Sequence, residues 1–108
     1  MPQLIVKGIR EDEVKVLAKS AAPDLADICN CPIDWFTFDY IPSKFYDFTG
    51  KEIVNPVIQV WWFEREQDVQ DKVVACLDNE IKNLGYEFSQ ISFSVFYKSS
   101  YYENSEHF

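Results

Sequence analysis

The chain repeats one order of sequence signals in its two halves. Each half begins with a proline and an apolar strand signal, then continues with an arginine, acidic residues, an amphipathic helix signal and a second strand signal. Pro2–Val6 aligns with Pro56–Val60. After a gap of one residue, Arg10–Val14 aligns with Arg65–Val69. A repeated strand-helix-strand order of this kind predicts two β-α-β units.

The expected elements follow from residue type and periodicity. Four segments rich in β-branched and aromatic residues predict strands, at Gln3–Ile9, Asp34–Ile41, Pro56–Phe63 and Ile91–Tyr97. Two segments with apolar residues at spacings of three, four and seven predict helices, from Glu11 to about Cys29 and from Glu66 to Leu84. A proline inside a helix loses a hydrogen bond, so Pro23 predicts a kink or a break.

These elements predict a single α+β domain covering residues 1–108. Its halves are 1–41 and 56–108, and the connector 42–55 carries a turn at Gly50. A right-handed crossover makes the strand pair of each half parallel. Two such units side by side give a four-stranded mixed sheet with both helices on one face.

The opposite face of that sheet is expected to be apolar in part and to need a cover. Trp61 and Trp62 are adjacent in a strand, so their side chains point to opposite faces. One indole therefore lies on the face that has no helices. Nine Phe, six Tyr and three Trp are many rings for a small interior, which favours a second copy of the chain as the cover.

Charge excludes two classes of partner. The net charge is −8 and the isoelectric point about 4.5, which disfavours nucleic acid and anionic membrane surfaces. No apolar run approaches about 18 residues, and the start of the chain lacks the layout of a signal peptide. We therefore expect no membrane association.

The cysteines favour a reducing compartment. Cys29, Cys31 and Cys76 are an odd number, which is typical of free thiols in the cytoplasm. Cys29 and Cys31 form a C-x-C pair with neither a second pair nor a nearby histidine, so the sequence predicts no zinc site. We expect no metal and no cofactor.

Pro2 is the residue with the most specific chemical interpretation. A small second residue normally allows removal of Met1, and Pro2 would then carry a free secondary amine. An α-amine has a pKa near 7.7–8.0. Cations such as Lys7 and Arg10 would lower this pKa, so that the amine is a neutral base at pH 7. The alternative is a proline that merely starts an edge strand; if Met1 is retained, the nitrogen is an amide without a basic lone pair.

Length, element order and several segments together resemble the tautomerase superfamily, which includes 4-oxalocrotonate tautomerase and macrophage migration inhibitory factor. Ile9–Lys19 is similar to the strand-to-helix junction of the former, and Cys31–Phe45 is similar to the segment after the first helix in the branch of the latter. The ending YYENSEHF resembles the tails of a small uncharacterised bacterial family within this superfamily.

The resemblance implies a homotrimer with the sheets packed into a central barrel and active sites near subunit boundaries. It also implies an isomerase of small 2-hydroxy or 2-keto acids, with Pro2 as general base and an arginine as the ligand of the substrate carboxylate. Arg10 is the first candidate for that ligand, since its planar fork matches a carboxylate, and Lys7 lies close in sequence. The further candidates are Arg65, with the site of a neighbouring subunit as its alternative place of action, and the pocket walls Tyr40, Trp61 and Tyr97.

Each of these assignments has a plain structural alternative. Arg10 also suits the exposed start of a helix, and aromatic residues in strands commonly belong to the core. Tyr97 or Tyr101 is a candidate proton donor, whereas His107 lacks catalytic partners and is expected at the surface. The tail Tyr101–Phe108 is expected to dock on an adjacent subunit.

One departure from the superfamily pattern bears on activity. The migration-inhibitory-factor branch has a lysine just before the proline that follows the first helix, and Cys31 stands there in this chain. Lys44 is the available substitute. Two functions therefore stay open, a tautomerase-like isomerase and a non-catalytic trimeric protein with a binding or structural role. Dehalogenation or decarboxylation by the same proline would use the same site.

Overall fold

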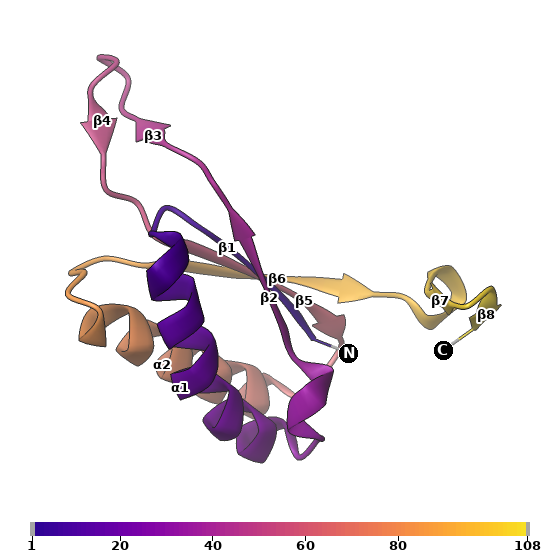
Figure 1. Cartoon of the computed structure of the whole chain (residues 1–108). Helices are drawn as coiled ribbons and strands as arrows, with labels where there is room; N and C mark the ends of the chain where they lie inside the picture. Colours follow the sequence, from indigo (N-terminus) through magenta and orange to yellow (C-terminus); the bar gives the residue numbers. More distant parts are fainter. Residues whose placement is uncertain (1, 108) are drawn as a thin grey trace.

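A computed structural model describes residues 2–107 as one sheet covered by two helices on a single face, with two small hairpins outside this body (Figure 1). The main sheet has the strand order β2-β1-β5-β6. Its strands are β1 (Gln3–Lys7), β2 (Thr37–Ile41), β5 (Val57–Phe63) and β6 (Gln90–Phe96), and its helices are α1 (Glu11–Cys29) and α2 (Gln67–Asn83). The expected α+β architecture is confirmed, with strand ends shifted by up to three residues.

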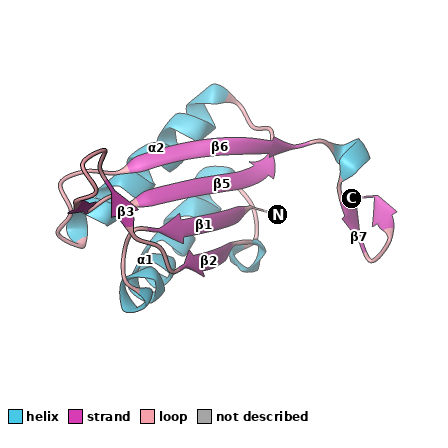
Figure 2. Ribbon diagram, turned by 90° about the horizontal axis from the view of Figure 1, so that it is seen from above, coloured by secondary structure: helices cyan, strands magenta, loops and turns pink. Residues whose placement is uncertain are grey.

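The strand pairing makes the sheet mixed. β1 pairs with β2 in parallel and β5 pairs with β6 in parallel, as expected for two β-α-β units (Figure 2). The two units join through an antiparallel β1–β5 pair, in which Gln3 lies opposite Trp61 and Lys7 lies opposite Val57. β1 is consequently an inner strand. The suggestion that Pro2 starts an edge strand is wrong, because the second β-α-β unit docks on that side.

Alternation along the strands builds the core. Successive side chains point to opposite faces, so every second residue of β1 and β5 meets the helices. The buried apolar residues of these strands and of the two helices form one cluster: Leu4, Val6, Ile9, Val14, Leu17, Ala21, Leu25, Ile58, Val60, Trp62, Val73, Leu77 and Ile81. Trp62 points into this cluster and Trp61 to the bare face, so the predicted opposite orientation of the two indoles is confirmed.

Helix α1 runs without a break through Pro23. The proline side chain is exposed, while Ala21 before it and Leu25 after it are almost completely buried against the core. A proline in a helix interior costs about 3 kcal/mol, and burial of residues on both sides outweighs that cost. The expected break is therefore wrong.

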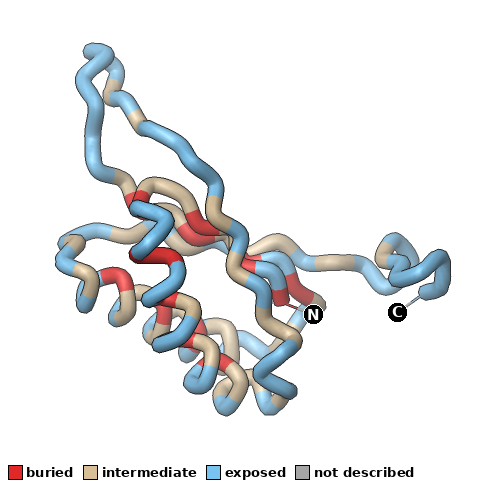
Figure 3. The backbone as a smooth tube through the Cα atoms, in the orientation of Figure 1, coloured by how far each residue is buried: buried red, intermediate tan, exposed pale blue. Residues whose placement is uncertain are grey.

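The connector and the tail each form a small hairpin that extends away from the body (Figure 3). The connector pairs β3 (Phe45–Tyr46) with β4 (Glu52–Ile53), and Gly50 occupies its turn with φ +85°. The tail contains a 3-10 turn, η2 (Lys98–Ser100), followed by β7 (Tyr102–Glu103) and β8 (Glu106–His107). The sequence predicts the turn but neither pair of two-residue strands.

Within the tail hairpin, His107 contacts two residues, Tyr102 and Lys98. The His107 ring lies 4.3 Å from the Tyr102 ring, and its Nδ1 is 3.1 Å from the Lys98 carbonyl oxygen. His107 is exposed, as expected for a surface residue. Phe108, which the expected docking of the tail includes, lies outside the described residues.

Two classes of feature are absent from the described part of the chain. Neither helix within residues 2–107 is both long and apolar enough to cross a bilayer. In the same range, no group of three or more His, Cys, Asp and Glu side chains is placed to hold a metal ion.

Candidate functional site

The seven residues singled out from the sequence are divided between the two ends of the main sheet. Strand β1 separates Pro2 from Arg10, and a strand rises about 3.3 Å per residue. Four steps therefore place the Cα atoms of Gln3 and Lys7 about 13 Å apart. Pro2 precedes Gln3 and Arg10 follows Lys7, so within one chain neither Lys7 nor Arg10 lies next to Pro2.

Pro2 lies at the start of β1 and is buried. Its carbonyl oxygen accepts a hydrogen bond from the Thr37 amide at 3.3 Å, which joins the starts of β1 and β2. On the other side of β1, Gln3 lies opposite Trp61 of the antiparallel strand. Extending this register by one residue sets Pro2 beside Trp62.

Arg65 lies at the same end of the sheet as Pro2. Its guanidinium carbon is 5.0 Å from the centroid of the Trp62 ring, and its Nη1 donates a hydrogen bond to the Phe63 carbonyl oxygen at 3.1 Å. A guanidinium over an indole face is attracted by the ring quadrupole. The two contacts hold the arginine at the end of β5, and because β5 is antiparallel to β1, this end is where β1 starts.

The Trp62 indole has a second property of interest at this end. The ring is buried against Phe93, with the two centroids 4.8 Å apart. Its Nε1 donor is buried and has no hydrogen-bond partner among the described residues. A buried donor without an acceptor costs about 1–3 kcal/mol, so this position favours the arrival of an acceptor.

An aromatic cluster covers the bare face of the sheet at the Pro2 end. Phe96 is its centre, with ring centroids 5.8 Å from Trp61, 5.7 Å from Phe63 and 4.9 Å from Tyr101. Trp61 keeps 37% of its surface exposed. Tyr97, which is 74% exposed, follows β6 and begins the tail. The Pro2 end therefore combines a proline, a cation and an apolar wall.

Cys29 adds a thiol near this cation. It is the last residue of α1 and packs partly against the core. Burial raises the pKa of the Cys29 thiol, and the positive charge of Arg65 opposes that shift. The thiol is therefore protonated at neutral pH and presents an apolar surface rather than a nucleophile.

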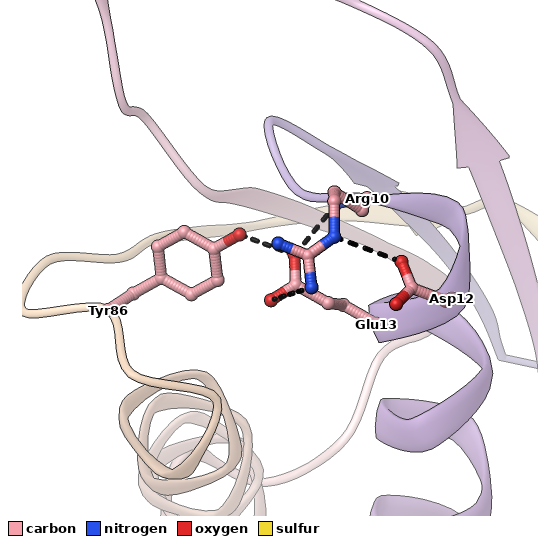
Figure 4. A network of polar contacts seen from close by, with 4 residues as sticks. All are labelled: Arg10, Asp12, Glu13 and Tyr86. Carbon is pink, nitrogen blue, oxygen red and sulfur yellow. Dashed lines mark hydrogen bonds and ion pairs between the residues drawn. The ribbon is translucent and has the colours of Figure 1, made fainter.

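At the opposite end of the sheet, Arg10 belongs to a network of side chains at the start of α1 (Figure 4). Its Nε lies 3.1 Å from Asp12 Oδ1 and its Nη2 lies 3.7 Å from Glu13 Oε2. Glu13 Oε1 also accepts hydrogen bonds from the Arg10 backbone amide at 2.9 Å and from the Tyr86 hydroxyl at 2.5 Å. Glu13 is buried, and both of its carboxylate oxygens have partners in this network.

The contacts in this network shift the pKa values of two of its members, Asp12 and Tyr86. The hydrogen bond from Arg10 lowers the pKa of Asp12. Burial, together with the hydrogen bond to Glu13, raises the pKa of Tyr86 to about 12. Arg10 thus faces two carboxylates of its own chain, and with 71% of its side chain exposed it fits the alternative of an exposed helix-start residue.

The remaining candidates also lie at the Arg10 end. Tyr40 is paired with Val6 in the β1–β2 register and packs against the core on the helix face, which fits its reading as a core residue. Lys44 Nζ lies 3.8 Å from Glu52 Oε1 in the connector. Cys31 precedes β2 and Lys44 follows it, so within one chain the two residues lie at opposite ends of this strand. A shallow cavity of about 210 Å³ at this end includes Gly8, Arg10, Lys44, Glu52 and Tyr86 in its lining.

The Arg10 end is the internal counterpart of the Pro2 end. Pro56 starts β5, and its carbonyl oxygen accepts a hydrogen bond from the Gln90 amide at 3.0 Å, as that of Pro2 does from Thr37. Gly8, at φ +86°, lies so close that a Cβ there would be 2.0 Å from the Asn55 carbonyl oxygen and 3.1 Å from Pro56 Cα. Pro56 therefore sits beside the β1-to-α1 junction that leads to Arg10, but its nitrogen is an internal amide.

Comparison with known structures identifies the class of fold. A macrophage migration inhibitory factor-like protein from Entamoeba histolytica aligns with a TM-score of 0.79 at 16% identity, over 99% of this chain and 98% of its own. A structure described as an R7 fused 4-OT wild type asymmetric trimer aligns with a TM-score of 0.83 at 13% identity, over 97% and 94% of the two chains. The fold is that of the tautomerase superfamily, as the sequence resemblance implies.

The family follows from sequence as well as structure. The sequence model of the family described as a domain of unknown function (DUF1904) matches residues 1–107, and the chain belongs to this family. A crystal structure of a DUF1904 domain from Sebaldella termitidis ATCC 33386 is 34% identical over the whole of both chains, with a TM-score of 0.93. No curated protein sequence matches the chain.

Proposed function

We propose that this protein is a cofactor-independent, tautomerase-like isomerase of small 2-hydroxy or 2-keto acids, with the amine of Pro2 as its general base. After removal of Met1, the amine takes a proton from the enol oxygen or activated carbon of the substrate and returns it to another atom of the same molecule. No atom is lost and no oxidant is needed. The cytoplasm, suggested by the free cysteines, is the proposed location.

The arrangement of Pro2, Trp62 and Arg65 is the observation that carries this proposal. The antiparallel β1–β5 pair returns Arg65 to the end of the sheet where Pro2 lies. Its cation disfavours protonation of a nearby amine, and so does burial of Pro2, so both effects lower the pKa of the base. The same guanidinium offers two parallel donors to a substrate carboxylate.

The other groups at this end have complementary roles in the proposal. Trp61, on the bare face, and the exposed Tyr97 would supply an apolar wall where copies of the chain meet. The substrate class that fits is a small carboxylate with an enolisable neighbouring carbon.

We propose a homotrimer as the functional form, because the aromatic cluster on the bare face needs a cover. Lys7, Arg10 and Tyr40 lie a strand's length from their own Pro2. If they contribute to catalysis, they do so at the site of a neighbouring copy. The central barrel implied by the superfamily is part of this proposal.

A non-catalytic trimeric protein with a binding or structural role is the alternative, and one observation favours it. Pro2 is buried within a single chain. A base must reach its substrate, so a permanently covered proline would indicate that the fold has been kept without its reaction. Loss of the lysine at the position of Cys31 points the same way.

The mass of the untagged protein, expressed in a bacterial cytoplasm, decides whether the mechanism is available. A mass that lacks one methionine means that Pro2 has a free amine. A panel of enolisable keto acids is then assayed by ultraviolet absorbance, with haloacrylates and decarboxylation substrates beside them. A retained Met1, or a free amine with no turnover of any of these compounds, would leave the binding or structural role.

A further inference from the structure

The tip of the connector hairpin is a built structure that presents one apolar ring to solvent. Asp47 Oδ1 accepts hydrogen bonds from the Thr49 amide at 2.9 Å, the Thr49 hydroxyl at 2.6 Å and the Lys51 amide at 3.1 Å. The Asp47 amide donates to the Lys51 carbonyl oxygen at 2.8 Å, and the Gly50 amide donates to the Asp47 carbonyl oxygen at 3.0 Å. These bonds fix the turn, yet Phe48 within it is 100% exposed.

This ring contributes nothing to the packing of its own chain. Full burial of a phenylalanine is among the larger favourable contributions available to one side chain. Tyr46, Ile53 and Val54 on the same hairpin are also exposed, at 58%, 41% and 72%. A rigid projection that gathers exposed apolar groups is typical of a docking element.

The same chain has a cavity that fits such a ring. It measures about 390 Å³ and is lined by Val54, Pro56, Gly85, Tyr86, Glu87 and Phe88. An apolar cavity of about 150 Å³ is sufficient to hold benzene, so a phenyl ring enters this one with room to spare. Phe88 in its lining is 53% exposed and lacks an apolar cover.

A chain does not fill this cavity with its own Phe48. Val54 lies at the base of the hairpin, and the β3–β4 pair carries the tip away from the body (Figure 1). The ring is fully exposed in its own chain, so only another molecule buries it. A projection and a matching cavity on one chain make a head-to-tail contact between copies, which closes into a ring when the rotation allows.

Charges support a second copy as the partner. Lys51 lies across the turn from Asp47, three residues after Phe48, and Glu87 lies in the lining of the cavity. Both side chains are exposed, and neither has an ion-pair partner within residues 2–107. When the ring of one copy enters the cavity of another, opposite charges approach one another.

We infer that Phe48 of one copy inserts into the cavity formed by Val54, Pro56 and residues 85–88 of a neighbouring copy, with Lys51 facing Glu87. The contact goes beyond the proposed reaction and uses neither Pro2 nor Arg65. A Pro2→Ala variant should therefore lose turnover and keep this contact, which separates failure of one proposal from failure of the other.

Cross-linking locates the contact directly. p-Benzoylphenylalanine replaces Phe48, and the protein is mixed with isotopically heavy wild-type chains before irradiation. Mass spectrometry should find light-to-heavy cross-links at residues 54–56 or 85–88. Cross-links to the bare sheet face around Trp61, or none between chains, would overturn the inference.

Truncation of the Phe48 ring tests its contribution to self-association. Sedimentation equilibrium should show that Phe48→Ala weakens self-association by at least about 30-fold, the effect of truncating a buried anchor. Val16→Ala, which changes an exposed apolar residue on α1, is the matched control and should leave self-association unchanged.

Charge exchange tests whether Lys51 and Glu87 face one another. Lys51→Glu and Glu87→Lys should each weaken self-association about fivefold, and the double variant should restore the wild-type affinity. Additive losses in the double variant would contradict the pairing of Lys51 with Glu87.

Discussion

The starts of β1 and β5 hold equivalent places in the two β-α-β halves, yet they differ in chemistry. Each has a buried proline whose carbonyl oxygen accepts a hydrogen bond from the neighbouring strand. At the β1 start, Arg65 lies over Trp62 and has no ion pair with a carboxylate among the described residues. At the β5 start, Arg10 faces Asp12 and Glu13, and Glu13 also holds Tyr86.

This difference indicates a division between function and stability. An arginine held by an aromatic face and a carbonyl oxygen keeps its charge available for a ligand. An arginine in contact with two carboxylates has most of its charge already compensated. We therefore expect the Pro2 end to bind an anion. At the Arg10 end, the contacts of Glu13 with Arg10 and Tyr86 join the start of α1 to the segment that follows α2.

Replacing the two prolines tests the comparison most strongly. Pro2→Ala should lower kcat/KM by about 100- to 10,000-fold, the range of a general base, because a primary amine at a displaced position replaces the positioned secondary amine. Pro56→Ala is the matched control, since it alters the equivalent strand start without touching an amine, and should retain turnover. Steady-state kinetics of a keto acid that the wild type isomerises measures both. Similar losses in the two variants would mean that the proline acts through the fold alone.

Replacing the two arginines distinguishes their roles. Arg65→Ala should raise KM by about 10- to 100-fold, since a hydrogen bond to a charged group contributes about 1.5–3 kcal/mol. Arg65→Lys should recover part of this loss, because it keeps the charge and loses the planar fork. Arg10→Ala should leave KM within about twofold. The reverse result, with Arg10 the sensitive residue, would place the carboxylate ligand on a neighbouring copy.

Neutralising the buried carboxylate at the Arg10 end should reduce stability rather than activity. Glu13→Gln should lower the free energy of unfolding by about 1–2 kcal/mol, because its hydrogen bonds to Arg10 and Tyr86 lose their charge assistance. Asp12→Asn, at an exposed position in the same helix turn, should cost less than about 0.5 kcal/mol. Urea unfolding followed by fluorescence measures both. An equal effect of the two substitutions would argue against a special role for the buried group.

The smallest expected effect is a dependence of stability on alkaline pH. Folding raises the pKa of Tyr86 from 10.0 to about 12, so the folded state keeps a proton that the unfolded state releases. The stabilisation is therefore complete below pH 10 and is lost as the pH rises through 12. Tyr86→Phe should flatten this part of the stability curve relative to wild type. Unfolding curves recorded at pH 9, 10 and 11 test this, and parallel curves for the two proteins would contradict it.

The fold was largely predictable because the repeated pattern determines it. The strand and helix signals, the parallel pairing within each half and the opposite orientation of Trp61 and Trp62 all follow from local periodicity. The expected break at Pro23 was wrong because propensity is local, whereas the burial of Ala21 and Leu25 that keeps the helix continuous is a tertiary effect. The two-residue strands of the hairpins were missed because such short pairs leave no periodic signal.

The residues named for the site stay a prediction, and the structure groups them differently from what their order in the sequence suggested. Arg10 follows Pro2 closely in sequence, and this closeness suggested a pair that the intervening strand separates. The alignment of the two halves contained the necessary signal, since antiparallel docking of two equal units brings the arginine of one half to the proline of the other. The orientation of that docking depends on packing between halves, which a single sequence does not display.

The antiparallel joint between the halves has a consequence for dissecting the protein. The connector tip between them is exposed, so we expect that a chain cut there would give two fragments able to pair through β1 and β5 and through the shared core. A second fragment that starts with methionine and Pro56 would acquire an amino terminus of its own. Removal of that methionine would then give the Arg10 end the secondary amine that an uninterrupted polypeptide denies it, and the paired fragments would carry two such amines where the proposed mechanism gives the intact chain one.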